Sequence, residues 1–585
     1  MRDMRFPRLS LLALLLTVSS ATLAAAPPEA VQRSLNAISG NAVKAHVKFL
    51  ASDLLEGRGP GTRGDALATQ YIASQFEEMG LLPAGDGGSY FQKVSLLGVT
   101  TIPAKTSVSF VKQDGPTLGP LKFLDEFVGA DLSQTETNTF DSEIVFVGHG
   151  VVAPEENWDD YKGLDTRGKT LVMLVNDPPA TAAEPNLFKG RARTYYGRWT
   201  YKLEIGAAKQ AKSVILIHTN DAAGYGWNVV RNSWSGEQGA VKNEPGKHAL
   251  TFAGWMTESV AKRLFAAAGY DLDTLTKAAG SRDFKPVPLG GYRMQGNVAS
   301  TIRPFVTNNV VARLEGTDPQ LKNQAVLYSA HHDHLGVGTP NEAGDRIYNG
   351  AIDNASGCGL LLELARVWSE AATRPKRSLI FAAVAAEEQG LLGSEFFGRN
   401  PVIPAGNIAL GINMDAIYLF GKVSGVTMLG AERMSFEPAT RRIAEGLGLT
   451  IVPDPAPEQG SYYRSDHFSL AKAGVPAFSI KQGNEIVGKD AEYGKQRSNE
   501  YRTKHYHQPS DEVDPTWDWS SAEQVGQLAF WLGYEAANAA EMPNWNAGDE
   551  FRAIRDRSQG MTSSSGAGAS GATSPQPRPR QEKER

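Results

Sequence analysis

The chain has 585 residues, with 59 Lys and Arg against 64 Asp and Glu and a formal net charge of -5. This length exceeds what one ordinary hydrophobic core serves, so we expect two or more domains. The near balance of charge argues against a nucleic-acid-binding protein, which would carry a basic excess.

Residues 1–26 have the pattern of a secretory signal peptide: three arginines, an apolar core at Leu11–Val18, and small residues at Ala21–Ala26. This core is much shorter than the about 20 residues that cross a bilayer, although an uncleaved anchor is the alternative. No later run is long enough, so we expect an exported protein, periplasmic or extracellular, without a membrane span. Cys358 is the only cysteine. It excludes an intramolecular disulfide and is expected to be a small buried residue.

The first part of the mature chain, residues 30–130, is predicted to be the N-terminal part of a peptidase domain. Apolar residues recur with helical spacing at 42–54 and 64–79. The Gly-rich segment Gly57–Gly61 separates these two predicted helices as a loop.

The sequence pattern changes over residues 131–290, which we interpret as an inserted, β-rich domain. Strand-like runs occur at 143–148, 170–175 and 213–218, with a helical pattern at 203–211. This segment separates the N-terminal helices from the region described next.

Residues 291–545 alternate continuous apolar strands with helices. Strands are predicted at 310–314, 326–330, 378–385, 408–414 and 476–480, and helices at 360–368 and 524–537. This pattern predicts an α/β fold with a mostly parallel, mixed central sheet and helices on both faces. The remaining tail, residues 558–585, is rich in Ser, Gly and Pro and is predicted to be disordered.

Acidic and imidazole side chains follow three of these predicted strands. His331, the pair Glu387 and Glu388, and Asp415 each come directly after an apolar run. Because ligands gather at the carboxyl ends of strands in open α/β sheets, these side chains are expected at one edge of the sheet.

The segment His331-His332-Asp333-His334 offers several imidazoles. In an extended segment alternate side chains share a face, so His331 and Asp333 point together. A metal-bound histidine usually needs a carboxylate to orient its ring, so we expect His331 as a ligand and Asp333 as its orienting partner. His332 and His334 are not expected to be ligands.

The carboxylates suit a metal centre better than the alternative roles of helix cap or solvated surface pair. Asp353 precedes a helix start, where it could be a simple cap, but beside the other segments it is expected to bridge two ions. Glu387 and Glu388 diverge as neighbours, so one can bind metal while the other faces water. A solvated surface pair is the alternative. Imidazole and carboxylate ligands favour zinc, although cobalt or manganese could substitute.

Taken together, these segments resemble the co-catalytic di-zinc aminopeptidase family, which also includes glutamate carboxypeptidase-type enzymes and glutaminyl cyclases. The resemblance implies two zinc ions per chain: one held by His331, Asp353 and Asp415, the other by Asp353, Glu388 and His507. It assigns Glu387 as general base for a water that bridges the ions. It also implies that a tyrosine before Asp466-His467 stabilises the oxyanion. Tyr462 fits that spacing best, with Tyr463 as the neighbouring choice.

The inserted segment resembles a protease-associated domain, on the motifs Gly148–Pro154, Trp158–Tyr161 and Arg198–Lys202. We therefore expect an exported zinc aminopeptidase that acts on peptides. The alternatives are a carboxypeptidase or dipeptidase on the same scaffold, a glutaminyl cyclase, or a non-catalytic receptor. The sequence leaves the preferred residue and the oligomeric state open.

Overall fold

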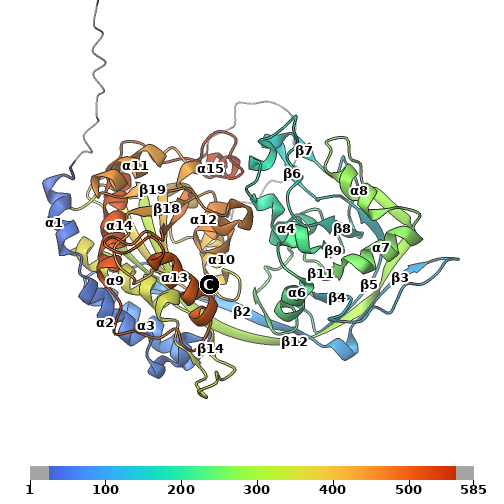
Figure 1. Cartoon of the computed structure of the whole chain (residues 1–585), viewed down its shortest axis with the longest axis horizontal. Coiled ribbons are helices and arrows are strands. Elements are labelled where there is room, and N and C mark those ends of the chain that lie inside the picture. The colour runs from blue at the N-terminus through green and yellow to red at the C-terminus, as the bar shows by residue number, and fades with distance from the viewer. Residues whose placement is uncertain (1–25, 561–585) are drawn as a thin grey trace, which may run out of the picture.

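The computed structural model describes residues 26–560. The predicted signal peptide (except residue 26) and the tail beyond residue 560 lie outside these residues. Two bodies are visible in Figure 1. We call residues 26–101 and 300–560 the main body, and residues 102–299 the inserted unit. Strands β2 (Phe91–Thr101) and β12 (Val287–Leu314) pass between the two bodies.

The main body is built on a mixed sheet. Its strands are, in spatial order, β19 (Thr450–Ile451), β18 (Gly425–Leu429), β20 (Ala477–Gln482), β17 (Ile408–Met414), β13 (Ala325–His331), β16 (Ser378–Val384) and the second half of β12. The four strands from β20 to β16 are parallel to one another, whereas β12 runs antiparallel to β16 and β18 runs antiparallel to β20. The predicted fold class is therefore confirmed.

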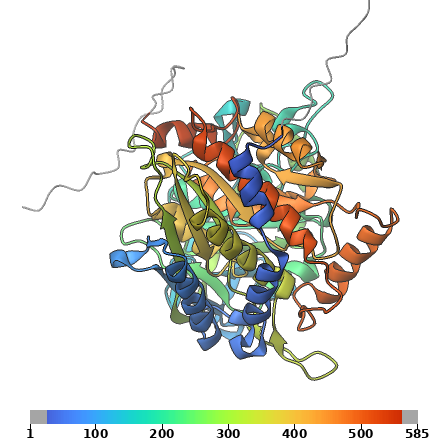
Figure 2. The same ribbon diagram turned by 90° about the vertical axis from the view of Figure 1, so that its left-hand side faces the viewer.

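Helices cover both faces of this sheet. One face carries α1 (Glu29–Ala37), α2 (Gly40–Leu50), α3 (Arg63–Glu78), α9 (Ser356–Ser369) and α14 (Ser520–Asn538); the other carries α10 (Leu392–Arg399) and α12 (His467–Lys472). Figure 2 looks onto the first face, where the blue N-terminal helices lie beside α14. Successive residues of β13 alternate between the two cores, with Tyr328 in one and Leu327 in the other. Burial on both faces explains why these strands read as continuous apolar runs.

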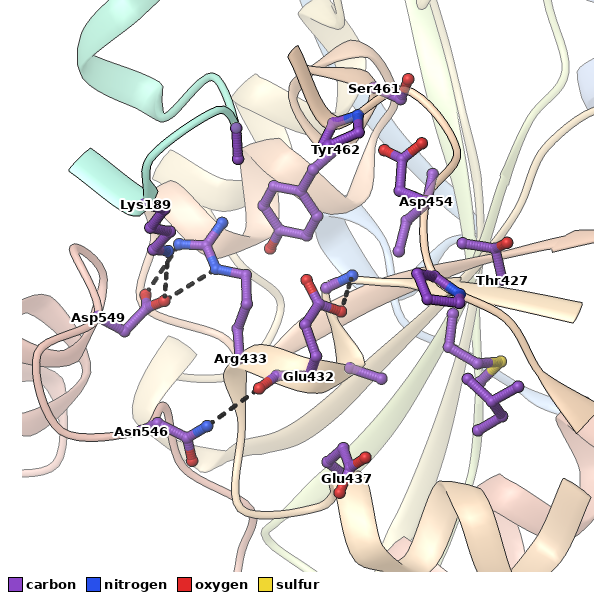
Figure 3. A pocket seen from close by; sticks show the side chains of 18 of the residues that line it. Lys189, Thr427, Glu432, Arg433, Glu437, Asp454, Ser461, Tyr462, Asn546 and Asp549 are labelled. Carbon is purple, nitrogen blue, oxygen red and sulfur yellow. Dashed lines mark hydrogen bonds and ion pairs between the residues drawn. The ribbon is translucent and has the colours of Figure 1, made fainter. Parts of the chain in front are cut away.

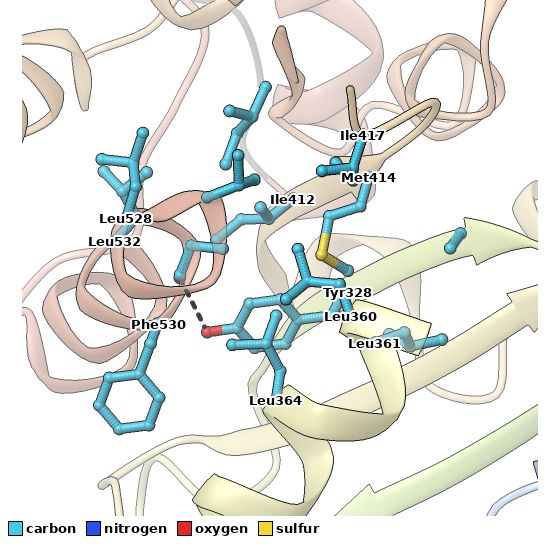
Figure 4. Packing of buried hydrophobic residues seen from close by; sticks show 14 of the residues in the cluster. Tyr328, Leu360, Leu361, Leu364, Ile412, Met414, Ile417, Leu528, Phe530 and Leu532 are labelled. Atoms are coloured by element: carbon cyan, nitrogen blue, oxygen red, sulfur yellow. Dashed lines mark hydrogen bonds between the residues drawn. The ribbon is translucent and has the colours of Figure 1, made fainter. Parts of the chain in front are cut away.

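The core beneath the N-terminal helices fixes α9 against the sheet (Figure 4). Leu360, Leu361 and Leu364 of α9 are fully buried around Tyr328. The Tyr328 hydroxyl donates to the Ala529 carbonyl of α14 over 3.2 Å. Burying each leucine stabilises the fold by about 2 kcal/mol, so the start of α9, which follows Asp353, has little freedom to move.

The inserted unit has its own part of the sheet, joined to the main sheet through β12, and three hydrophobic clusters. The strands are β12 (first half), β5 (Thr137–Phe146), β8 (Thr170–Leu174), β9 (Ser213–His218), β11 (Phe252–Thr257), β4 (Phe127–Ala130) and, on the other side of β12, β3 (Ser107–Lys112). Its main helices are α4 (Trp199–Ala208), α6 (Trp227–Ser233), α7 (Glu258–Ala267) and α8 (Leu272–Ala279).

The expected boundaries of the insertion, 131 and 290, need correction. Strands β3 and β4 precede residue 131 yet pair with β12 and β11 of the inserted unit. Strand β12 continues through residue 290: its residues 287–288 and 293–299 pair with β5, with a shift of register between them, and residues 300–310 pair with β2. Pairing between strands that are distant in sequence, which local composition does not reveal, sets the true limits.

The main body also extends past residue 545, where it was expected to end. Helix α15 (Arg552–Ser558) packs back onto it, with Phe551 and Arg555 buried. Two further helices belong to the main body: α11 (Glu437–Gly446) comes between β18 and β19 along the chain, and α13 (Tyr493–Glu500) between β20 and α14. Across residues 26–560, none of the helices combines the length and apolar character that a membrane crossing requires.

Candidate metal centre

Three neighbouring strands deliver side chains to the same edge of the main sheet. His331 is the last residue of β13, Glu387 follows β16, and Asp415 follows β17. Since β13 runs parallel to both β16 and β17, the carboxyl ends of the three strands meet. The convergence expected from the sequence is what the structure shows.

The first group of potential ligands contains His331, Asp353 and Asp415. The Nε2 atom of His331 lies 3.2 Å from Asp353 Oδ1 and 3.6 Å from Asp415 Oδ1. One donor atom from each of the three residues falls within 4.8 Å of the others. These are the three residues that the resemblance assigns to one zinc ion.

The second group lies on the other oxygen of Asp353. Asp353 Oδ2 is 3.2 Å from His507 Nε2, which is also 3.0 Å from Glu388 Oε2. The two oxygens of Asp353 thus face two different groups, as a bridging ligand requires. Gly350 allows this approach: it has φ of +57°, and a Cβ there would lie 2.2 Å from the Asp353 carbonyl and 2.6 Å from the His334 ring.

His334 belongs to this second group, contrary to expectation. Its Nδ1 atom lies 2.6 Å from Glu388 Oε1, and His334, Asp353 and Glu388 form a potential metal site. Strand alternation failed here because β13 ends at His331 and the chain then turns. His332 does lie away from both groups, with its Nε2 atom 3.0 Å from the Asn308 carbonyl.

The donor atoms of both groups fit zinc. Within residues 26–560, Glu388 Oε1, His507 Nε2 and both ring nitrogens of His334 are buried and make no hydrogen bond of acceptable geometry, although His334 Nδ1 lies 2.6 Å from Glu388 Oε1 and His507 Nε2 lies 3.0 Å from Glu388 Oε2. Such orphaned groups are costly unless an ion completes them. Carboxylate and imidazole donors in this number suit zinc.

Without metal, protons bound to the histidines supply the positive charge of this site. Burial lowers the pKa of His507, but the Asp353 and Glu388 carboxylates outweigh it and raise that pKa to about 10. Burial opposes ionisation of Asp353, but hydrogen bonds from His331 and His507 hold its pKa well below its ordinary range. The site therefore binds positive charge strongly, and zinc must displace a proton to enter.

Glu387 stands beside the ligand groups without joining either. Burial is the main cause of a strongly raised pKa, and the Glu388, Asp466 and Asp415 carboxylates raise it further. Glu387 lines two adjoining cavities, one of about 220 Å³ with Asp353 and Asp415, the other of about 290 Å³ with Glu388. We call these the inner cavity and the outer cavity. A carboxyl with a raised pKa at this junction has the properties of a proton carrier.

Asp333 acts differently from expectation. The nearest contact of His331 Nδ1 is the Asp333 backbone carbonyl at 3.3 Å, while the Asp333 carboxylate oxygen is at 3.8 Å. The Asp333 carboxylate instead accepts from the backbone N–H groups of Glu387 over 3.0 Å and Glu388 over 3.4 Å. Asp333 thus orients the general-base candidate as well as the histidine.

Two positioning residues were missed from the sequence. Asp511 accepts from the N–H groups of Ile352 over 3.0 Å and Asp353 over 3.1 Å, which fixes the bridging carboxylate. It lies four residues after His507, and that shared motif was the available signal. Arg58 is fully buried and donates to backbone carbonyls, among them His332 over 2.7 Å and Gly350 over 3.0 Å. Nothing local in the Gly57–Gly61 loop points to that role.

The structure does not place Tyr462 where an oxyanion would form. Its hydroxyl donates to the Ala477 carbonyl over 3.1 Å, and its ring lies against the Arg433 guanidinium. Figure 3 shows the ring in a separate pocket with Arg433 and Asp549. The Tyr463 hydroxyl donates a hydrogen bond to Glu550 Oε1 over 2.8 Å. The tyrosine that lines both the inner and the outer cavity is Tyr506.

Comparison with known proteins agrees with this geometry. Residues 309–532 match the description "Peptidase family M28". A probable zinc metalloprotease of Pyricularia oryzae is 38% identical over 140 residues, covering 24% of this chain and 26% of the relative. Leupeptin-inactivating enzyme 1 of Streptomyces exfoliatus is 27% identical over 194 residues, covering 32% of this chain and 40% of the relative. The matched part spans about a quarter of the length of the first of these relatives.

Among solved structures, an aminopeptidase from Aneurinibacillus sp. strain AM-1 aligns with a TM-score of 0.45 and 18% identity, covering 88% of this chain and 97% of that one. A zinc aminopeptidase from Bacillus subtilis aligns with a TM-score of 0.38 and 16% identity, covering 86% and 96%.

Fold and site together resemble those of zinc metallopeptidases. The family match agrees with the resemblance seen in the motifs, because residues 309–532 are similar to peptidase family M28.

Proposed function

We propose that the protein is an exported di-zinc aminopeptidase that removes N-terminal residues from peptides. The observation that carries this proposal is the position of Asp353, whose two oxygens face two separate ligand groups. Glu387 lies next to both groups at the junction of two cavities. A peptide bond at that junction would meet both the metal centre and the proton carrier.

His331, Asp353 and Asp415 would hold one ion, and Asp353, Glu388 and His507 the other, with His334 close to Glu388. Zinc bound there would polarise the substrate carbonyl and acidify the attacking water. Glu387 would accept a proton from the attacking water and would pass it to the leaving amine. Asp333 keeps Glu387 in place by accepting hydrogen bonds from the backbone N–H groups of Glu387 and Glu388.

The proposal is tested by the release of N-terminal residues from aminoacyl anilides, with and without a chelator. Glu387→Gln keeps the shape of the side chain but cannot take up a proton, so kcat should fall by about 10²–10⁴-fold. Glu541→Gln, at an exposed position far from the cavities in sequence, is the matched control and should keep wild-type activity. Wild-type activity in Glu387→Gln would refute the assigned base, and release of C-terminal residues alone would refute an aminopeptidase.

Export is the second part of the proposal. It is supported by the basic start, apolar core and small residues over 1–26. Sequencing the N-terminus of the mature protein from a cell envelope or culture fraction tests it. A mature chain that still begins at Met1 would count against cleavage. We also propose that the inserted unit is a protease-associated domain, supported by its motifs and its β-rich part of the sheet.

A further inference from the structure

The inserted unit contributes side chains to the outer cavity. Arg198, Trp199 and Thr200, at the start of α4, line this cavity together with Glu387 and Glu388 of the main body. Arg464, in the main body, lines both the outer and the inner cavity. Two guanidinium groups from different bodies therefore border the space next to the general-base candidate.

The segment that carries Arg198 is anchored to the main body. The Arg193 N–H donates to the Pro457 carbonyl over 3.1 Å, and the Tyr195 ring packs edge-on against Phe468 with centroids 5.2 Å apart. The Lys472 ammonium forms an ion pair with Glu204 of α4 at 3.0 Å. These contacts on both sides of Arg198 fix it at the cavity wall.

Arg198 and Arg464 have no acidic partner. Within residues 26–560, no carboxylate lies within 4.0 Å of either guanidinium, and the buried Nε atom of Arg198 has no hydrogen-bond partner. The other acids of the cavity wall are engaged: Glu204 pairs with Lys472, and Glu395 pairs with Arg399. Burial, followed by repulsion from Arg464 and Arg193, lowers the pKa of Arg198 to about 10.

An unpaired, half-buried guanidinium costs free energy unless an anion completes it. We propose that Arg198 and Arg464 bind a carboxylate of the peptide substrate on the leaving-group side of the scissile bond. A planar guanidinium matches a carboxylate with two parallel hydrogen bonds. This inference rests on the proposed aminopeptidase function and names its substrate class: short peptides whose C-terminal or acidic side-chain carboxylate reaches the outer cavity.

Arg198 lines only the outer cavity, whereas Arg464 lines both cavities. The outer cavity is therefore the place where a substrate carboxylate meets both guanidinium groups. A short peptide bound with its N-terminal residue at the metal centre would extend its C-terminal part toward them.

The test compares hydrolysis of Leu-Ala with Leu-Ala-amide, and of Leu-Asp-amide with Leu-Asn-amide, by the zinc-loaded full-length enzyme. Each pair differs by one carboxylate. The wild type should prefer the carboxylate-bearing member of at least one pair by about 10–100-fold in kcat/KM, mainly through KM. Arg198→Gln and Arg464→Gln should each reduce that ratio several-fold. Arg464 is exposed, so its substitution serves if Arg198→Gln fails to fold.

The matched control is Arg191→Gln, which removes an arginine from the same segment but outside the cavity, where it pairs with Glu458 at 3.5 Å. It should leave the ratio unchanged. A preference within the first pair identifies the C-terminal carboxylate, and one within the second pair the side chain. Equal rates in both pairs, or a preference that survives both arginine substitutions, overturn the inference while leaving the aminopeptidase intact. No release of leucine from any of the four peptides overturns the proposed function itself.

Discussion

The main body and the inserted unit each bury a cluster of charged side chains, but the two clusters differ in how they are satisfied. In the inserted unit, the Lys202 ammonium donates to the His149 carbonyl over 2.6 Å and the Asn176 carbonyl over 3.2 Å. Asp160 accepts from the Val151 N–H over 2.9 Å and the Trp158 indole over 2.8 Å. At the metal centre, Glu388 Oε1, His507 Nε2 and the ring nitrogens of His334 lie close together without a hydrogen bond of acceptable geometry.

Both clusters have shifted pKa values, so the shifts alone do not distinguish them. Burial lowers the pKa of Lys202 to about 8 and raises that of Asp160 to about 6. The metal centre differs because its buried donor atoms lack well-formed hydrogen bonds and lie in two groups that could each hold an ion. Buried charge indicates a ligand site only when the protein itself leaves that charge incomplete.

The largest effect should come from the shared ligand. Asp353→Asn removes the charge that both ligand groups use, so zinc content should fall well below that of the wild type. Activity should drop at least as far as the about 10²–10⁴-fold expected for loss of a general base. Metal analysis and anilide assays measure both. The control in the other cluster is Asp160→Asn, which should leave zinc content unchanged. Full zinc content in Asp353→Asn would contradict the bridging role.

The next largest effect is expected in the buried charged cluster of the inserted unit. Lys202→Met leaves the buried Asp160 and Asp177 without their cation, which should reduce the free energy of unfolding by about 3–5 kcal/mol. Thermal or denaturant unfolding measures this loss, and zinc content of the folded fraction should not change. Lys277→Met, at an exposed position of α8, is the control. If Lys202→Met lowered zinc affinity without loss of stability, the contrast between the clusters would fail.

A smaller effect concerns pH. The pKa of His507 is about 10 in the metal-free site, above the about 6.5 of an unfolded chain. Its ion pairs therefore stabilise the metal-free protein fully below pH 6.5, and this contribution is lost as pH rises through about 10. Zinc uptake at pH 7 should release protons from His507 and from His331, whose pKa is also raised well above its ordinary value, so His507→Ala should reduce that release by about one proton. Calorimetry in two buffers of different ionisation enthalpy measures it. His505→Ala is the control, and unchanged proton release in His507→Ala would count against the assignment.

The smallest effect tests the tyrosine that sequence spacing favoured. Tyr462→Phe removes one hydrogen bond to the Ala477 carbonyl, so stability should fall by about 1 kcal/mol with little change in kcat. Tyr506→Phe, beside both cavities, should lower kcat more. The reverse order of effects on kcat would restore Tyr462 as the oxyanion donor.

The convergence of His331, Glu388 and Asp415 was predictable because the signal for each of them is local. His331, Glu388 and Asp415 follow apolar strands whose parallel order the sequence also indicates, so their meeting follows from the fold. His334 was not predictable, since its position depends on where β13 stops being extended. Arg58 lies more than 270 residues from the loop that it supports, and Arg198 reaches the cavity only through packing of one body on the other. Local patterns carry no information about such contacts.

The continuity of β12 has a consequence for how this protein could have been assembled. Thr101 and Ser300 face each other across the β2–β12 ribbon, so the chain leaves the main body and returns to it at adjacent points. Residues 102–299 therefore stand where the turn of a hairpin formed by β2 and β12 would be. A two-residue turn such as Asn-Gly joining Thr101 to Ser300 would close the ribbon without altering the main sheet. Insertions of very different length can be accommodated at this point during evolution. Each would change the side chains that line the outer cavity, while the candidate metal ligands stay in place.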